Sequence, residues 1–97
     1  MAGYVSLLKF TEKGMASVKT MPDQIAKTKQ QLQKIGVRLI GIWMTMGEYD
    51  GVAIFDAPDD LTMASALLSS EMQGMNATHT MRALSEDEIA KVVKQLP

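Results

Sequence analysis

The sequence contains no cysteine, and this absence excludes several kinds of function at once. Disulfide bonds, thiolate nucleophiles and cysteine-ligated metal sites cannot form. The formal net charge of −1 at pH 7 gives no bulk attraction to nucleic acid or to an anionic membrane. No apolar run approaches the roughly 18–20 residues that span a bilayer, and the first residues lack the pattern of a secretory signal. We therefore expect a cytoplasmic protein that binds neither nucleic acid nor membrane.

The residues that are present suit one small domain over positions 1–97. Hydrophobic residues make up 46% of the chain, charged residues 22% and aromatic residues only 5%. A chain of this length buries roughly 60–70% of its unfolded surface, enough for one core. Nine methionines suit a plastic core or interface, although a bias of composition explains them equally well. We expect such a chain to gain further stability by self-association.

Four apolar segments rich in β-forming residues predict strands at 4–10, 37–46, 49–57 and 76–84. Gly47 and Glu48, between the second and third of these, have the length of a tight hairpin. Helical spacing of apolar residues predicts a helix that begins near Pro22 and ends before Gly36. Its apolar stripe consists of Met21, Ile25, Leu32 and Ile35.

Two more helices follow the third and fourth strands. Asp59 or Asp60 is a suitable N-cap for the first of them, and Gly74 a suitable end. Ser85 and Glu88 have the spacing of a capping box at the start of the last helix. The predicted buried stripes are Leu61, Ala64, Leu68 and Met72, and then Ile89, Val92, Val93 and Leu96.

This order of elements predicts an α+β fold of the ferredoxin-like kind. Its β-α-β-β-α-β pattern gives an antiparallel sheet in strand order 4-1-3-2, with helices on one face and an added C-terminal helix. The second strand carries Ile40, Ile42 and Met44 on one side and Leu39 and Trp43 on the other. An exposed sheet face of several hundred Å² would cost of order 10 kcal/mol. We therefore expect a second copy to cover it, as a dimeric α/β barrel or a higher assembly of dimers with any cavity near the interface.

Several separated segments resemble the GYD domain family. They are TMGEYD at 45–50, DAPDD at 56–60 and GMNATHTMRA at 74–83, and the resemblance extends over residues 3–84. Glu48 separates Gly47 from Tyr49, so the triplet that names the family is interrupted. The resemblance implies a dimeric α/β barrel and leaves the biochemical role open.

Two residues are candidates for catalysis. His79 is the only histidine, and histidine is the usual general base near neutral pH. Tyr49 can donate a proton or a hydrogen bond, whereas its neighbour Asp50 points to the opposite face of the strand. In the alternative reading, His79 is an ordinary strand residue, and Tyr49 and Asp50 hold the turn. One histidine without cysteine disfavours a zinc site and leaves open only a metal held by His79 with carboxylates. Some dimeric α/β barrels bind haem through a histidine, but no other residue here points to haem, so we expect no metal and no cofactor.

Four residues are candidates for ligand binding. Thr78, Thr80 and Arg82 share one face of the fourth strand and can form a small polar lining. Trp43 can stack on a flat ligand, although an aromatic of this size more often belongs to a core or an interface. Arg82 can equally lie in solvent as part of a surface ion pair.

Two functions remain open at this level. The first is a homo-oligomeric module that binds a small molecule or serves in assembly. The second is a cofactor-independent enzyme that acts on a small carbonyl or aromatic compound, with His79 as base and Tyr49 as donor. RNA binding is disfavoured because residues 49–57, YDGVAIFDA, are acidic where RNA-binding strands are basic.

Overall fold

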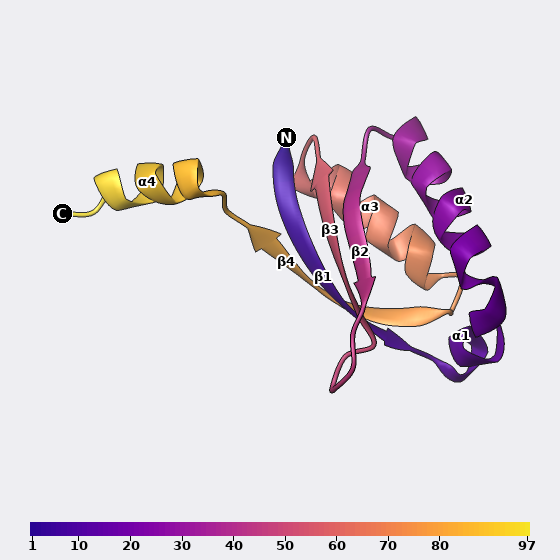
Figure 1. Cartoon of the computed structure of the whole chain (residues 1–97). Helices are drawn as coiled ribbons and strands as arrows, with labels where there is room; N and C mark the ends of the chain where they lie inside the picture. The colour runs from indigo at the N-terminus through magenta and orange to yellow at the C-terminus, as the bar shows by residue number, and fades with distance from the viewer.

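A computed structural model describes residues 1–97, and its four strands form one antiparallel sheet (Figure 1). The strands lie in the order β2-β3-β1-β4, which confirms the predicted ferredoxin-like topology. The elements are β1 (Ala2–Phe10), α1 (Glu12–Ala16), the 3-10 turn η1 (Val18–Thr20), α2 (Met21–Lys34), β2 (Arg38–Met44), β3 (Gly51–Ala57), α3 (Asp60–Glu71), β4 (Asn76–Ala83) and α4 (Glu86–Lys94). No helix combines the length and the apolar character that crossing a membrane requires.

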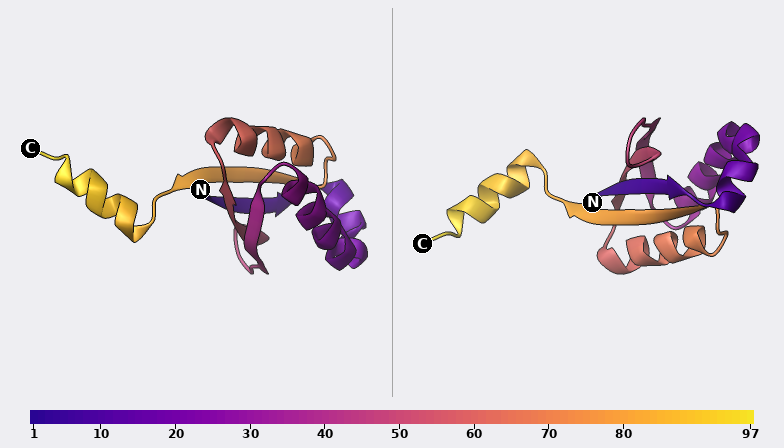
Figure 2. Two further views of the ribbon diagram at one scale, coloured as in Figure 1. Left: turned by 90° about the horizontal axis from the view of Figure 1, so that it is seen from above. Right: turned by 90° about the horizontal axis from the view of Figure 1, so that it is seen from below.

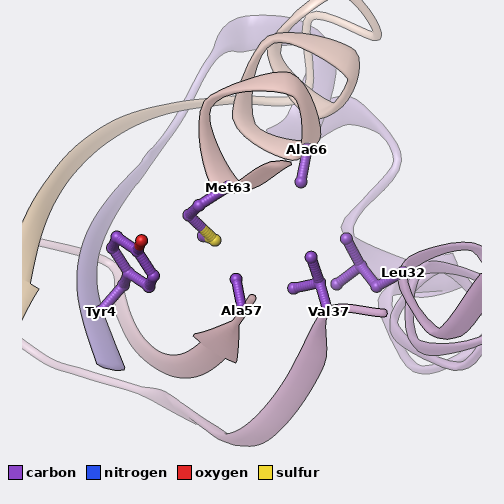
Figure 3. Packing of buried hydrophobic residues seen from close by; sticks show 6 residues of the cluster. All are labelled: Tyr4, Leu32, Val37, Ala57, Met63 and Ala66. Carbon is purple, nitrogen blue, oxygen red and sulfur yellow. The ribbon is translucent and has the colours of Figure 1, made fainter. Parts of the chain in front are cut away.

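The core lies between the sheet and the two long helices α2 and α3 (Figure 3). Its buried cluster consists of Tyr4, Leu32, Val37, Ala57, Met63 and Ala66. The Tyr4 hydroxyl donates a 2.5 Å hydrogen bond to Asp60 at the start of α3, and this bond raises the pKa of Tyr4. The core is small, since only 10 of the 97 residues are buried.

The helix ends follow the predicted signals. Asp59 caps α3 by accepting a 2.7 Å hydrogen bond from the Thr62 N–H, which lowers the pKa of Asp59. Ser85 and Glu88 form the predicted capping box at the start of α4. The hydrogen bond from the Ser85 N–H, together with Arg82 nearby, lowers the pKa of Glu88.

The predicted buried stripe of α3 is wrong in phase. Leu61, Leu68 and Met72 are 84%, 64% and 86% exposed. The residues that face the sheet are instead Met63, Ala66 and, half-buried, Leu67. Helix α3 therefore has two apolar stripes, and periodicity alone does not tell which of them meets the sheet.

Two details of β2 and β3 also differ from the prediction. The strands are connected by residues 45–50, a longer loop than a hairpin of Gly47 and Glu48 alone. An irregularity between Leu39 and Gly41 shifts the register of β2 against β3. A bulge of this kind adds one residue to a strand and reverses which side chains share a face. Leu39 consequently lies on the helix side with Ile42 and not beside Trp43.

Helix α4 gives the molecule its elongated shape, because it extends past the end of β4 and away from α2 and α3 (Figures 1 and 2). The radius of gyration is 14.7 Å, and the molecule measures 52 × 32 × 19 Å. A compact domain of this length has a radius of gyration of about 12.5 Å. The chain thus carries an element that lies outside its own compact body.

Candidate functional site

The sheet face that points away from α2 and α3, called here the outer face, is apolar across all four strands. Trp43, Val52, Leu7 and His79 lie in register as one row from edge to edge of the sheet. Ile54, Val5 and Met81 form the middle of the next row. Trp43 is 53% exposed and Met81 50% exposed. No helix covers this face, so its apolar side chains lie in solvent when the chain is alone.

The indole of Trp43 lies flat along β2. A Cβ atom at Gly41 would be 2.6 Å from the Cη2 atom of Trp43, so the ring occupies the space above this glycine. Gly41 and Trp43 are two residues apart on one strand and share a face. The flat indole ring therefore fills the space above Gly41, and the β2 edge of the outer face is flat enough to contact another flat surface.

At the opposite edge of the outer face, Tyr49 meets His79. The Tyr49 hydroxyl is 3.4 Å from His79 Nδ1, and the two rings lie edge to face with centroids 5.7 Å apart. Lys9 Nζ lies 5.6 Å from the centre of the tyrosine ring. The fold thus brings the two predicted catalytic residues together, and a phenol beside an imidazole is able to transfer a proton.

Trp43 does not join this pair within one chain. It lies on edge strand β2, whereas His79 lies on edge strand β4. Three strand spacings separate the two edges, which is about 14 Å. A site that contains Trp43 and His79 together needs a second copy of the chain.

Asp50 has a structural role that its position in a turn did not reveal. Its carboxylate accepts a 2.8 Å hydrogen bond from the Phe10 N–H at the end of β1. Its own N–H donates to the Leu8 carbonyl at 2.8 Å. Asp50 therefore fastens the start of β3 to the end of β1, and Tyr49 beside it is left to face His79.

The predicted polar lining lies on the other side of the sheet and does not converge. The Thr80 hydroxyl is 2.6 Å from that of buried Ser6, and the Thr78 hydroxyl donates to Glu71 at 2.7 Å. Arg82 donates to the Gly3 carbonyl and to Glu88, each at 3.2 Å. Each of the three predicted residues is thus occupied by its own partner.

A cavity of about 140 Å³ lies between the sheet, α2 and α3. Of its 21 lining residues 14 are hydrophobic, among them Leu8, Phe10, Ile25 and Phe55, and Thr78 is one of the polar ones. No pattern in the sequence indicates this cavity, because its walls come from residues that were expected to pack together. No group of three or more His, Cys, Asp or Glu side chains is arranged to hold a metal ion.

Comparison with known proteins decides the family. The family model described as GYD domain matches residues 4–93. The chain belongs to the GYD domain family. This GYD chain is similar to a protein of Thermus thermophilus named glutamine synthetase and cystathionine beta-lyase binding protein. The two are 29% identical over 85 residues, which cover 87% of this chain and 90% of that protein.

The fold of this GYD domain is similar to that in the crystal structure of MtbAldR. The TM-score is 0.68 at 10% sequence identity, and the matched part covers 88% of this chain. The chain spans 52% of that protein's length. At this identity the similarity shows the fold alone, and it agrees with the ferredoxin-like topology described above.

Proposed function

We propose that this GYD protein is a homo-oligomeric binding module that pairs with a second copy through the outer face and, once paired, binds another protein. The observation that carries the proposal is the exposed apolar outer face. Its apolar centre is bordered by polar groups: the Arg38–Asp56 ion pair at one end, with a 2.7 Å contact, and Lys9, Tyr49 and His79 at the other. An apolar centre inside a polar rim is the usual anatomy of a protein interface.

The size of the exposed surface supports the pairing. The chain exposes 7011 Å², whereas a folded monomer of 10.6 kDa exposes about 5,500 Å². The excess of about 1,500 Å² is nearly twice the roughly 800 Å² that each partner buries in a standard interface. Face-to-face packing of two sheets about 10 Å apart removes apolar surface of this kind from water.

The name of the Thermus relative supports a second protein as the further partner. That protein is named for binding glutamine synthetase and cystathionine beta-lyase. In this chain, the exposed stripe of α3 formed by Leu61, Leu68 and Met72 lies on the helix layer, opposite the outer face. It therefore stays accessible after two outer faces have paired. We assign this stripe as the docking surface for the partner enzyme, with glutamine synthetase as the first candidate.

The test measures mass and binding on the same samples. Native mass spectrometry of the purified protein is expected to show a dimer or an assembly of dimers. Binding to glutamine synthetase from the same source, measured by surface plasmon resonance, is expected to be lost in Leu68→Glu. The control is Ser69→Glu, which adds the same charge one residue along α3 and beside the stripe. A monomer at micromolar concentration contradicts the pairing, and equal binding by both variants contradicts the docking surface.

A catalytic role is the second candidate, favoured by the 3.4 Å approach of Tyr49 to His79. In this form the protein is a cofactor-independent enzyme that acts on a small carbonyl or aromatic compound. Pairing about a two-fold axis parallel to the strands sets the β2 edge of one copy over the β4 edge of the other. Trp43 of the second copy then becomes a wall beside His79 and Tyr49. Native mass spectrometry with added aromatic aldehydes tests this: retention by the wild-type dimer and loss in the dimer that Trp43→Ala still forms at high concentration support it, and no retention contradicts it.

A further inference from the structure

Side-chain hydrogen bonds hold the first turn of helix α4, although few other contacts hold the helix. The Glu88 N–H donates to Ser85 Oγ at 3.2 Å, and the Ser85 N–H donates back to Glu88 Oε1 at 3.1 Å. Glu88 also accepts the 3.2 Å ion pair from Arg82 of β4. This pair is the only side-chain bond between α4 and a strand, and no residue of α4 is buried.

The apolar face of α4 has nothing to pack against in one chain. Ile89, Val92 and Val93, together with Leu96 just after the helix, fall on one side at helical spacing. They are 51%, 46%, 56% and 63% exposed. Lys91 and Lys94 lie on the opposite side. A helix of nine residues is shorter than the roughly 12–15 at which isolated helices become marginal in water, so α4 depends on a surface that covers its apolar face.

The chain's own body does not supply that surface. Figure 2 shows α4 projecting beyond the end of β4 in both views, clear of the sheet and of the helix layer. The radius of gyration of 14.7 Å, against about 12.5 Å for a compact chain of this length, reflects the same separation. The Arg82–Glu88 ion pair links the first turn of α4 to the end of β4, and the helix points outward from there (Figure 1).

A second copy is the occupant that the surface favours. Met81 of the outer face is 50% exposed, and Leu84, between β4 and α4, is 47% exposed. Apolar side chains therefore continue along the chain from the outer face to α4. The excess of about 1,500 Å² is also larger than one standard interface patch of roughly 800 Å² requires. The outer face and the apolar face of α4 together account for a partner surface of that extent.

We infer that α4 is an exchanged arm, whose apolar face packs on the second copy of this chain and not on its own body. This inference rests on the pairing proposed above. In a two-fold assembly the exchange is reciprocal, so each dimer contains the contact twice. Lys91 and Lys94 remain in solvent on the outer side of each arm.

The first experiment changes the face of the arm without changing its helix. Ile89→Glu combined with Val93→Glu places two charges on the apolar face, and glutamate favours helix at least as well as isoleucine or valine. The matched control is Lys91→Glu, which changes the net charge by the same two units on the opposite side. Sedimentation equilibrium is expected to show at least about 100-fold weaker association for the double variant, and association within about threefold of wild type for the control. Association of the double variant at wild-type strength overturns the inference.

The second experiment identifies the body on which the arm lies. Unlabelled and ¹⁵N-labelled copies are mixed, allowed to exchange subunits and treated with a short amine-reactive cross-linker. Peptides that join Lys91 or Lys94 to lysines of the sheet and helices are expected in mixed-label form. Cross-links in same-label form only, or none from the two arm lysines, overturn the inference.

The outcomes separate the arm from the pairing on which it rests. A wild-type oligomer that keeps its mass in the double variant leaves the pairing through the outer face intact and overturns the exchanged arm alone. A wild-type monomer overturns both. If the double variant instead keeps its oligomeric state and loses glutamine synthetase, the arm is a surface for the enzyme and the inference is wrong.

Discussion

Replacing Trp43 by alanine is expected to weaken self-association strongly and to leave the fold of each chain in place. The side chain is the largest on the outer face, and it stands on an edge strand and outside the buried cluster. Its indole rests on Gly41, a contact that contributes nothing to the packing of α2 or α3 on the sheet. The change therefore removes surface that the proposed second copy would cover.

The expected magnitude follows from the exposed area. A tryptophan buries up to about 250 Å², and Trp43 is 53% exposed in the single chain. Covering the remaining roughly 130 Å² contributes about 3 kcal/mol per copy at about 25 cal/mol per Å². A two-fold interface contains the residue twice, which gives an upper bound of about 6 kcal/mol. Because buried area converts only partly into affinity, we expect dimerisation to weaken by about 10² to 10⁴-fold.

The residue reports on its own environment, since it is the only tryptophan in the chain. On dilution of the wild type, its emission is expected to shift to longer wavelength as the dimer dissociates, in step with the mass from sedimentation equilibrium. Met46→Ala serves as the control, because Met46 is 98% exposed in the loop between β2 and β3. The reasoning is refuted if the emission is that of a solvent-exposed indole at every concentration, or if Trp43→Ala associates as the wild type does.

Three further outcomes are expected. Gly14→Ala should lower the free energy of unfolding, measured in urea, by about 1–3 kcal/mol, because the new Cβ would overlap the backbone oxygen of Met75. A change below about 0.5 kcal/mol would contradict the close packing of α1 against Met75. Asp59 has a lowered pKa in the fold, so its cap stabilises the protein above the unfolded value of 3.8 and the benefit is lost as the pH falls through the folded pKa. Asp59→Asn keeps the hydrogen-bond acceptor, so the free energy of unfolding in urea should fall less steeply in acid for this variant than for the wild type. Parallel curves of unfolding free energy against pH for the two proteins would argue against the cap. In the paired protein, Trp43 of one copy is expected to lie beside His79 of the other, so His79→Ala should shift the emission maximum of Trp43 in the dimer, and an unchanged emission would rule out that arrangement of edges.

The topology was predictable from the sequence because each turn carries its own signal. Pro22, Gly36, Asp59 and the Ser85–Glu88 box mark helix ends that the structure places within a residue or two. Right-handed crossovers then leave few ways to order four strands. The faces of the elements were harder to predict. The irregularity next to Ile40 reverses the side on which Leu39 lies, and a bulge has no clear signal in an apolar strand.

The side of the sheet on which each candidate residue lies was predictable, and the grouping of these residues was less so. Strand alternation correctly separates His79 from Thr78 and Thr80. It does not show that residues 45–50 carry Tyr49 back to His79, or that Asp50 leaves the loop to bind the Phe10 N–H. Contacts between β4 and the β2–β3 loop depend both on the strand order and on the length of the loop. The loop was predicted too short, so the contact between Tyr49 and His79 was not predicted. The distance between Trp43 and His79 follows from strand order alone.

The wrong phase of α3 and the uncovered face of α4 have a common explanation. An apolar stripe in a sequence does not show whether its own chain or another molecule covers it, and the pairing proposed above would cover side chains that one chain leaves exposed. On α3 the stripe with Met63 and Ala66 meets the sheet, while the stripe with Leu68 and Met72 is exposed. The outer face and the apolar face of α4 are likewise exposed in the single chain. The chain buries 10 of its 97 residues and leaves three further apolar surfaces exposed. These three surfaces are the reason why we propose self-association and protein binding before a closed monomeric enzyme.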